Sequence, residues 1–247
     1  METEKCIVLK HIYKNFGEHQ VLKDVSIEVP YGAIYGMLGP SGCGKTTTVK
    51  IIAGISEATS GDVLVVNEKM PNLELMGKVG YMAQSDALYG DLTARQNLEF
   101  FGQLYGIENV KLKLRIEEVI KVVNLYKDLD KAVSDFSGGM KRRLSLAMTI
   151  LHEPKVLILD EPTVGIDPLL RKNIWNELYK MTESGVTILV TTHVMDEAEK
   201  CTHLSMMREG KLLATGTPAE IQVKAGAQNL EEAFVYFSSM DEEDEGQ

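Results

Sequence analysis

The amino-acid sequence predicts an α/β protein built around a parallel sheet. Short apolar runs that suit strands alternate with segments of helical periodicity over most of the chain. The run at residues 156–159 is continuously apolar, as in strands that are buried on both faces of a parallel sheet. The 247 residues include 44% hydrophobic and 25% charged residues, the balance of a globular protein. A chain of this length fits one large domain or a core with a subdomain.

The N-terminal part is expected to be rich in β-strands. Three strands are predicted first, at residues 7–13, 21–29 and 33–38. A helix should follow over 47–53 and end at Gly54, because glycine commonly terminates helices. Strand character returns from Gly61, and another short strand is predicted at 79–83.

The middle of the chain is expected to be a helical subdomain of about residues 85–150. Thr93 and Gln96 have the spacing of a capping box, which marks a helix N-terminus. A second helix is predicted over 112–125 and a third from Ser137 through Leu151, and no strand is expected between 85 and 135.

Strands and helices then alternate again toward the C-terminus. Further strands are predicted at 156–159, 186–190 and 203–207, with helices at 169–181 and 195–200. We expect a single domain over residues 1–240. Five of the last seven residues are acidic, so residues 241–247 are expected to form a disordered tail.

Charge and cysteine content exclude several kinds of protein. The 26 basic and 36 acidic residues give a net charge of −10, which provides no basic excess for broad binding to nucleic acid or anionic lipid. Cys6, Cys43 and Cys201 lack metal-ligand spacing and are expected to be free thiols in a reducing compartment. No run reaches the roughly 18 apolar residues of a membrane-spanning helix, and the first residues do not resemble a signal peptide. Any membrane role is therefore expected to come through a partner protein.

Residues 39–46 fit the phosphate-binding pattern G-x-x-x-x-G-K-[ST] between a predicted strand and a predicted helix. Backbone amides and the helix N-terminus of such a loop bind phosphate. Lys45 is expected to neutralise the β and γ phosphates, and Thr46 to offer its hydroxyl to Mg²⁺. The residues predicted to contact nucleotide here are Gly39, Pro40, Ser41, Gly42, Cys43, Gly44, Lys45, Thr46 and Thr47. The simpler alternative is a glycine turn with an exposed lysine.

The apolar strand at 156–159 ends in two acids, Asp160 and Glu161. Ligands bind at the carboxyl ends of parallel strands, and adjacent strand residues point in opposite directions, so the two acids are assigned different roles. Asp160 is expected to bind Mg²⁺. Glu161 is expected to act as general base on a water molecule aligned with the γ phosphate. Alternatively, the pair could merely cap the next turn.

A five-residue segment adds a resemblance to the ATP-binding cassette (ABC) family that covers nearly the whole chain. Phe136-Ser137-Gly138-Gly139-Met140 resembles the family signature, which usually reads Leu-Ser-Gly-Gly-Gln. Methionine at its end, followed by Lys141-Arg142-Arg143, is similar to cassettes of drug, antibiotic and lipid exporters. Ser137 can cap a helix whose first amides remain accessible to an anion, although an ordinary helix cap is the simpler alternative.

Four further features match the family in order along the chain. Gln84 resembles the Q-loop glutamine, residues 164–167 the D-loop, His193 the switch histidine and Phe16 the aromatic that stacks on adenine. The resemblance implies that Gln84 binds metal and that Gln84, Lys45, Glu161 and His193 form the catalytic set. It assigns Ser137, Gly138, Gly139 and Met140 to nucleotide binding. By themselves, His193 could be structural and Phe16 a core residue.

The resemblance implies a P-loop NTPase core and an ATP-hydrolysing subunit of an ABC transporter, with ATP and Mg²⁺ as cofactors. It implies a dimer of two cassettes, identical or different, in which each ATP lies between the phosphate loop of one and residues 137–139 of the other. Separate transmembrane permease subunits would bind near residues 84–110 and hold the chain at the cytoplasmic face of the membrane. Export of a hydrophobic or lipid-like substrate is favoured.

Two other functions stay open at this point. One is a soluble cassette ATPase that acts on a protein assembly, for example in iron–sulfur cluster assembly. The other is a nucleotide sensor without turnover, which Glu161 and His193 disfavour. Family members that act on nucleic acid carry two cassettes or a long coiled coil, and this chain has neither, so no nucleic-acid partner is expected.

Overall fold

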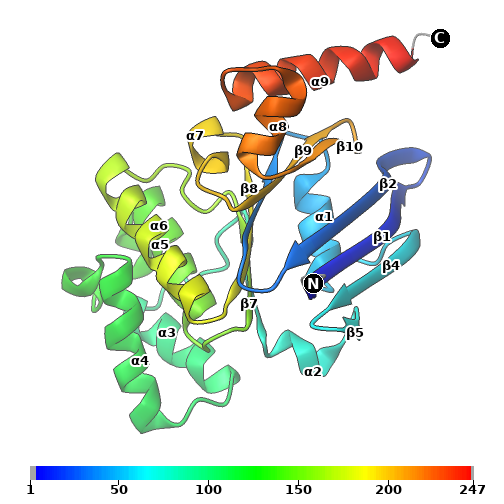
Figure 1. The fold of residues 1–247 in the computed structure, drawn as a ribbon. Helices are drawn as coiled ribbons and strands as arrows, with labels where there is room; N and C mark the ends of the chain where they lie inside the picture. Colours follow the sequence, from blue (N-terminus) through cyan, green and yellow to red (C-terminus); the bar gives the residue numbers. More distant parts are fainter. Residues whose placement is uncertain (1–3, 246–247) are drawn as a thin grey trace. The chain divides into compact units, whose positions relative to one another are not determined.

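The computed structural model describes residues 4–245 of the chain (Figure 1). They fall into two compact units. Unit 1 combines residues 1–72 with 187–247, of which 4–72 and 187–245 are described, and unit 2 is formed by residues 73–186.

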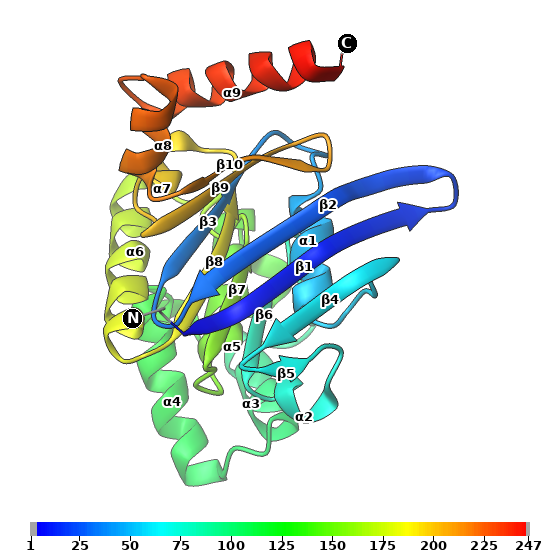
Figure 2. The same ribbon diagram turned by 45° about the vertical axis from the view of Figure 1, so that its right-hand side comes forward.

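Unit 1 contains an antiparallel sheet and a mainly parallel group of strands, both visible in Figure 2. The antiparallel sheet has the order β2 (His19–Pro30), β1 (Lys5–Phe16), β4 (Ser60–Val65) and β5 (Glu68–Lys69). The second group has the order β10 (Lys211–Gly216), β9 (His203–Arg208), β3 (Ile34–Leu38) and β8 (Thr187–Thr192). In it, β3 pairs in parallel with both β8 and β9. The β-rich N-terminal part is therefore confirmed.

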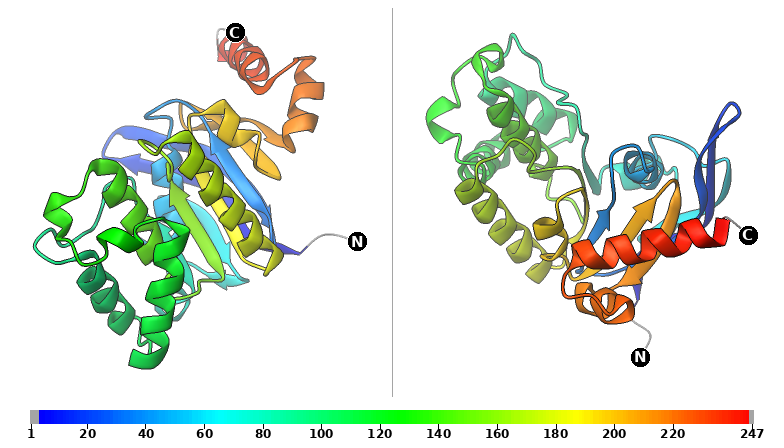
Figure 3. Two further views of the ribbon diagram at one scale, coloured as in Figure 1. Left: turned by 90° about the vertical axis from the view of Figure 1, so that its left-hand side faces the viewer. Right: turned by 90° about the horizontal axis from the view of Figure 1, so that it is seen from above.

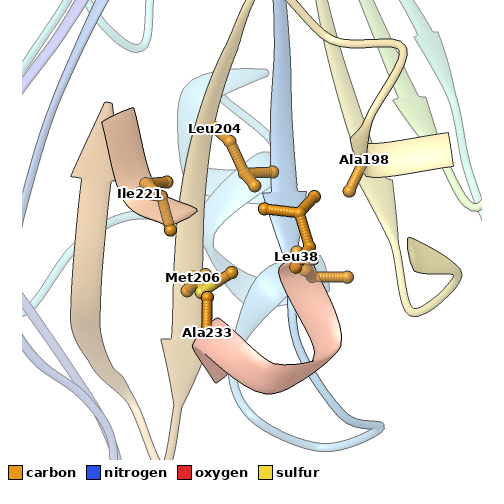
Figure 4. Packing of buried hydrophobic residues seen from close by; sticks show 7 residues of the cluster. Leu38, Ala198, Leu204, Met206, Ile221 and Ala233 are labelled. Carbon is orange, nitrogen blue, oxygen red and sulfur yellow. The ribbon is translucent and has the colours of Figure 1, made fainter. Parts of the chain in front are cut away.

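The helices of unit 1 are α1 (Lys45–Ile52), α7 (Met195–Ala198), α8 (Pro218–Ala225) and α9 (Leu230–Glu245). A capping box between Thr217 and Glu220 starts α8, and Gly226 with a φ of 62° ends it. Figure 4 shows how Ile221 of α8 and Ala233 of α9 pack with apolar side chains of the strands, among them Leu204 and Met206. Burial of this cluster fixes the C-terminal helices on unit 1.

Residues 241–245 of the expected disordered tail belong to α9, which continues to Glu245. Basic side chains of the neighbouring strands hold its later part. Arg208 donates to the Ser238 carbonyl at 3.2 Å, and the Lys211 ammonium lies 3.5 Å from the Asp241 carboxylate. These contacts link α9 to the strands and place positive charge beside an acidic part of the helix. Residues 246 and 247 lie outside the described part of the chain.

Unit 2 contains two parallel strands and a set of helices. Its strands are β6 (Val79–Met82) and β7 (Val156–Asp160), and every residue of β7 is buried. Its helices are α2 (Leu73–Met76), α3 (Ala94–Leu104), α4 (Asn109–Val122), α5 (Gly138–Ile150) and α6 (Pro168–Glu183), with 3₁₀ turns at Tyr126–Asp128 and Val133–Asp135. Helices α3, α4 and α5, green to yellow-green in Figure 3, pack on one another.

Most elements agree with the sequence predictions. The capping box at Thr93 is confirmed, since its hydroxyl accepts from the Gln96 amide at 3.1 Å and the Gln96 side chain accepts from the Thr93 amide at 2.9 Å. Residues 85–135 form no strand. Five elements were not predicted from the sequence: β5, α2, β10, α8 and α9. Of these, α2 spans four residues, and β5 and β10 contain no buried residue, so they lack a clear apolar pattern. Within residues 4–245, no helix is both long enough and apolar enough to span a membrane.

Candidate functional site

The phosphate loop connects β3 to α1 in unit 1, and its shape depends on two glycines. The Gly39 amide donates to the Thr192 carbonyl at 3.3 Å, and a Cβ at Gly39 would lie only 2.2 Å from the Met207 carbonyl oxygen. Gly44 has a φ of +109°, a conformation that other residues rarely adopt, at the N-cap of α1. Side chains at either position would displace the loop.

Lys45 begins α1 and is only 5% exposed. Its ammonium donates to the Gly39 carbonyl at 2.7 Å and to the Pro40 carbonyl at 2.9 Å, so the loop folds back around it. The alternative of an exposed lysine beside a glycine turn is therefore wrong. Among the other predicted contact residues, Pro40, Ser41 and Gly42 are exposed, Thr46 and Thr47 are half-buried, and Cys43 is buried.

Phe16 ends β1 with 57% of its surface exposed, which leaves a ring face open to a stacking partner. The neighbouring Lys14 pairs with Leu22 of β2, and a Cβ on Gly44 would lie 2.7 Å from the Leu22 side chain. This end of the β1–β2 hairpin therefore lies beside the phosphate loop. The Lys14 ammonium is 4.8 Å from the Phe16 ring centroid and restrains the ring. Phe16 is thus not a core residue.

His193 follows β8 directly and is exposed. Because Thr192 accepts the hydrogen bond from Gly39, the chain delivers His193 next to the phosphate loop. The Thr192 hydroxyl donates to the buried Glu197 carboxylate at 2.7 Å and accepts from the Val194 amide at 3.0 Å, which braces this segment. Sequence reasoning missed Glu197, because a lone acid in a short helix carries no signal of its burial.

In unit 2, the two acids at the end of β7 have different environments. The Asp160 residue is fully buried, whereas Glu161 is half-buried. Glu161 has a φ of +51°, in the left-handed region that is unfavourable for a residue with a side chain. A conformation of this kind costs on the order of 1–3 kcal/mol and is common at functional sites.

Arg142 of α5 connects two segments of the predicted site in unit 2, the one at Gln84 and the one at Asp160 and Glu161. The side chain is nearly fully buried, and its guanidinium donates to the carbonyls of Ala83, Gln84, Asp160 and Glu161. Burial lowers the pKa of Arg142 from its ordinary value, although the nearby acids Asp86, Asp160 and Glu161 oppose this. Sequence analysis noted Arg142 only within a basic run; no sequence signal marks it as buried.

The signature segment forms the start of α5. Ser137 is the N-cap, and its hydroxyl accepts from the Met140 amide at 3.2 Å. Ser137 and Gly138 are exposed, and a Cβ at Gly138 would meet nothing within 4 Å, so this helix N-terminus is accessible to an external anion. At Gly139, in contrast, a Cβ would lie 2.9 Å from the carbonyl of Gly165 in the predicted D-loop.

Gln84 is exposed two residues after the end of β6, and its backbone carbonyl accepts a hydrogen bond from Arg142. Beside this segment lies a cavity of about 250 Å³ whose lining includes Met82, Ala83, Phe101, Tyr105 and Met148. The rings of Tyr89, Phe100 and Phe101 contact one another at its side, with centroids 5.1–6.1 Å apart. The cavity and these rings form a partly apolar depression in unit 2, and most of its residues follow Gln84 in the sequence.

The predicted metal ligands suit Mg²⁺, which prefers oxygen ligands and is usually bound by one or two carboxylates together with substrate phosphates. Thr46 of unit 1 offers a hydroxyl, while Asp160 and Gln84 of unit 2 offer carboxylate and amide oxygens. In residues 4–245, no group of three His, Cys, Asp or Glu side chains forms a metal site by itself.

Comparisons with known proteins agree with this geometry. The family model described as ABC transporter matches residues 22–164. A "probable multidrug ABC transporter ATP-binding protein" of Escherichia coli is 40% identical over 241 residues, which are 94% of this chain and 41% of that protein. A Nod factor export ATP-binding protein of Cupriavidus metallidurans is 37% identical over 216 residues, 86% of this chain and 71% of the relative.

A solved structure agrees as well. It is a dimeric ATP-binding cassette in a post-hydrolysis state with ADP and Pi, which superimposes with a TM-score of 0.79 at 26% identity and covers 85% of this chain and 98% of its own. The chain spans less than half of the length of the Escherichia coli relative.

Proposed function

Because the chain belongs to the ABC transporter family, we propose that it is an ATP-hydrolysing subunit that powers export through separate membrane subunits. The observation that carries this proposal is the match over residues 22–164, which includes the phosphate loop, Gln84, the signature and the two acids at the end of β7. A nucleotide-binding module without turnover would not need Glu161.

The chemistry follows from the positions of the side chains. Lys45, held by two carbonyls, places a positive charge within the phosphate loop. Bound Mg²⁺ would neutralise charge on the phosphates, with Thr46, Asp160 and Gln84 as its ligands. Glu161 accepts a proton from the attacking water, and the exposed His193 beside the phosphate loop positions the γ phosphate.

A second cassette completes the nucleotide site. The N-terminus of α5 is exposed, and among the described residues a Cβ at Gly138 would meet nothing within 4 Å outside its own neighbours and helix backbone. This geometry suits the phosphates of ATP bound by another cassette. The similar cassette solved as a dimer with ADP and Pi supports the pairing of two cassettes.

Membrane subunits are proposed to bind the depression beside Gln84. The cavity of about 250 Å³ and the aromatic cluster of Tyr89, Phe100 and Phe101 provide apolar surface for a helix of a permease. Tyr89 and Phe100 are 49% and 44% exposed, so much of this surface is available. Bound in this way, the chain would lie at the cytoplasmic face of the membrane.

Export is the direction that the relatives favour, because one is named for multidrug transport and another for Nod factor export. The alternative of iron–sulfur cluster assembly finds no support in these names. We propose a hydrophobic or lipid-like substrate on the basis of the signature, which ends in methionine.

Two measurements test the proposal. The purified chain should hydrolyse ATP in the presence of Mg²⁺ and lose this activity with EDTA. Expressed together with candidate permeases, it should float with membrane vesicles in a density gradient, whereas the chain alone should stay at the bottom. Flotation without permeases would show direct binding to lipid and contradict attachment through membrane subunits, whereas no flotation with any candidate would favour a role on a soluble assembly.

A further inference from the structure

We propose that Arg142 is a positioning residue for ATP hydrolysis, which fixes the backbone of the general base Glu161 and that of Gln84 relative to each other through one guanidinium. This inference rests on the proposed ATPase function. It concerns a residue outside the phosphate loop, the signature contacts and the acids that carry the chemistry.

The contacts of Arg142 bring together segments that are far apart in the sequence. One terminal nitrogen donates to Ala83 at 2.5 Å and Gln84 at 3.0 Å, and the other donates to Asp160 and to Glu161, the latter at 2.9 Å. All four acceptors are backbone carbonyls. A planar guanidinium can serve two such pairs at once, whereas the ammonium of lysine is a single point from which it cannot reach both.

The Glu161 backbone needs such a support. Its φ of +51° is unfavourable, and conformations of this kind persist only where surrounding contacts over-determine them. The hydrogen bonds from Arg142 to the carbonyls of Asp160 and Glu161 bracket the strained residue on both sides. Arg142 therefore determines where the Glu161 carboxylate is directed, without touching the reacting atoms.

Helix α5 also connects Arg142 to the signature segment, because both belong to this helix. Asp86 lies 3.8 Å from the Arg142 guanidinium, and its carboxylate accepts from the Ser145 hydroxyl at 2.8 Å. Arg142 and Ser145 are three residues apart and share one face of α5. Ser137, the N-cap of α5, lies five residues before Arg142, about 7.5 Å along the helix axis. A contact of the signature with nucleotide would therefore be transmitted by a rigid helix to both Gln84 and Glu161.

The test compares Arg142→Lys with a matched control, Arg115→Lys, in the complete chain. Arg115 is also a partly buried guanidinium of unit 2, and it donates to the carbonyls of Ile150 and Leu151 at the other end of α5. Arg142→Lys should lower kcat for ATP hydrolysis by about 10–100-fold. Its nucleotide affinity should stay within about twofold, since the phosphate loop belongs to unit 1. Arg115→Lys should leave both unchanged, even where both variants have a lower melting temperature.

Amide hydrogen exchange provides a readout independent of turnover. Residues 83–86 and 161–164 should exchange faster in Arg142→Lys and not in Arg115→Lys. A wild-type kcat in Arg142→Lys, or a parallel loss of kcat in both variants, would overturn the positioning role. Absence of turnover in the wild-type chain would instead overturn the proposed ATPase function and this inference with it.

A milder variant keeps the test valid if Arg142→Lys does not fold. Asp86→Asn retains an acceptor for Ser145 but removes the charge that faces Arg142. It should lower kcat about threefold at unchanged nucleotide affinity. An unchanged kcat in the folded Asp86→Asn variant would also argue against the proposal.

Discussion

The phosphate loop of unit 1 and the catalytic strand end of unit 2 are built in opposite ways. The loop is formed by consecutive residues, 39–47, and backbone contacts of Gly39 and Lys45 hold its shape. The strand end is assembled from residues 83–86, 160 and 161, which one side chain of α5 connects. We therefore expect nucleotide binding to depend on local backbone geometry, and hydrolysis to depend on the long-range contact that we propose for Arg142. Variants should separate the two properties.

The largest effect is expected for Glu161→Gln. The amide preserves shape and most hydrogen bonding but cannot accept the proton of the attacking water, so hydrolysis should fall by about 10²–10⁴-fold. ATP affinity should stay unchanged, because the phosphate loop is intact. Turnover is measured by phosphate release, and gel filtration with ATP should show accumulated dimers. Hydrolysis at the wild-type rate would show that Glu161 is not the base.

Lys45→Ala should have the opposite profile and affect binding first. Loss of a buried ammonium that faces phosphate removes charge-assisted hydrogen bonds worth about 1.5–3 kcal/mol, or roughly 10–100-fold in affinity. Binding of a fluorescent ATP analogue measures the change. Lys50→Ala is the matched control, because Lys50 lies on the same helix and is exposed. Equal affinities for both variants would contradict the assigned phosphate loop.

Gly138→Asp separates binding by one chain from closure of a dimer. A Cβ at this position meets no atom within 4 Å, and an acid in the first turn of α5 is favourable for the helix, so the fold should not be weakened. The carboxylate would repel phosphates on a partner cassette. Hydrolysis and ATP-dependent dimerisation should fall at least about tenfold, with monomer binding retained.

Gly139→Ala is the informative contrast to Gly138→Asp. Its Cβ would lie 2.9 Å from the Gly165 carbonyl within the same chain, so a lower melting temperature is expected. Normal ATP-dependent dimers of Gly138→Asp, analysed by gel filtration, would mean that the signature is only a helix cap.

The same contrast explains which features the sequence could predict. The phosphate loop, the capping box at Thr93 and the buried strand β7 are patterns of neighbouring residues, and their interpretation agrees with the structure. Arg142 and Glu197 are charged side chains whose burial depends on segments that are distant in the sequence, so local patterns gave no signal. Helix α9 contacts Arg208 and Lys211, which lie in neighbouring strands, and the composition of the tail gives no sign of these contacts.

A smaller effect is expected at the edge of the nucleotide site. Phe16→Ala removes a ring that is exposed beside the phosphate loop, and base stacking on an aromatic is worth about 1–3 kcal/mol. ATP affinity should therefore fall about tenfold, while Phe16→Tyr keeps the ring and should bind normally. The phosphate contacts do not depend on Phe16, so inorganic triphosphate should bind all three proteins equally. Unchanged ATP affinity of Phe16→Ala would remove Phe16 from the site.

The smallest effect concerns the acid stability of unit 2. Burial lowers the pKa of His152 below its ordinary value of 6.5. The positive charge of Arg115 also lowers this pKa, whereas a hydrogen bond with the Val79 backbone raises it. The unfolded chain therefore binds this proton at higher pH than the folded chain does. The corresponding stability is present above about pH 6.5 and is lost as the pH falls through the folded pKa.

His152→Phe should retain the stacking on Tyr105, whose ring centroid lies 3.9 Å from that of His152, but remove the titration. Urea unfolding at pH 7.5 and pH 5.5 should then show a smaller loss of stability for the variant than for the wild type. ATP affinity, which depends on the loop in unit 1, should not distinguish them at either pH. An equal loss of stability in both proteins would show that the pKa of His152 does not differ between the folded and the unfolded chain.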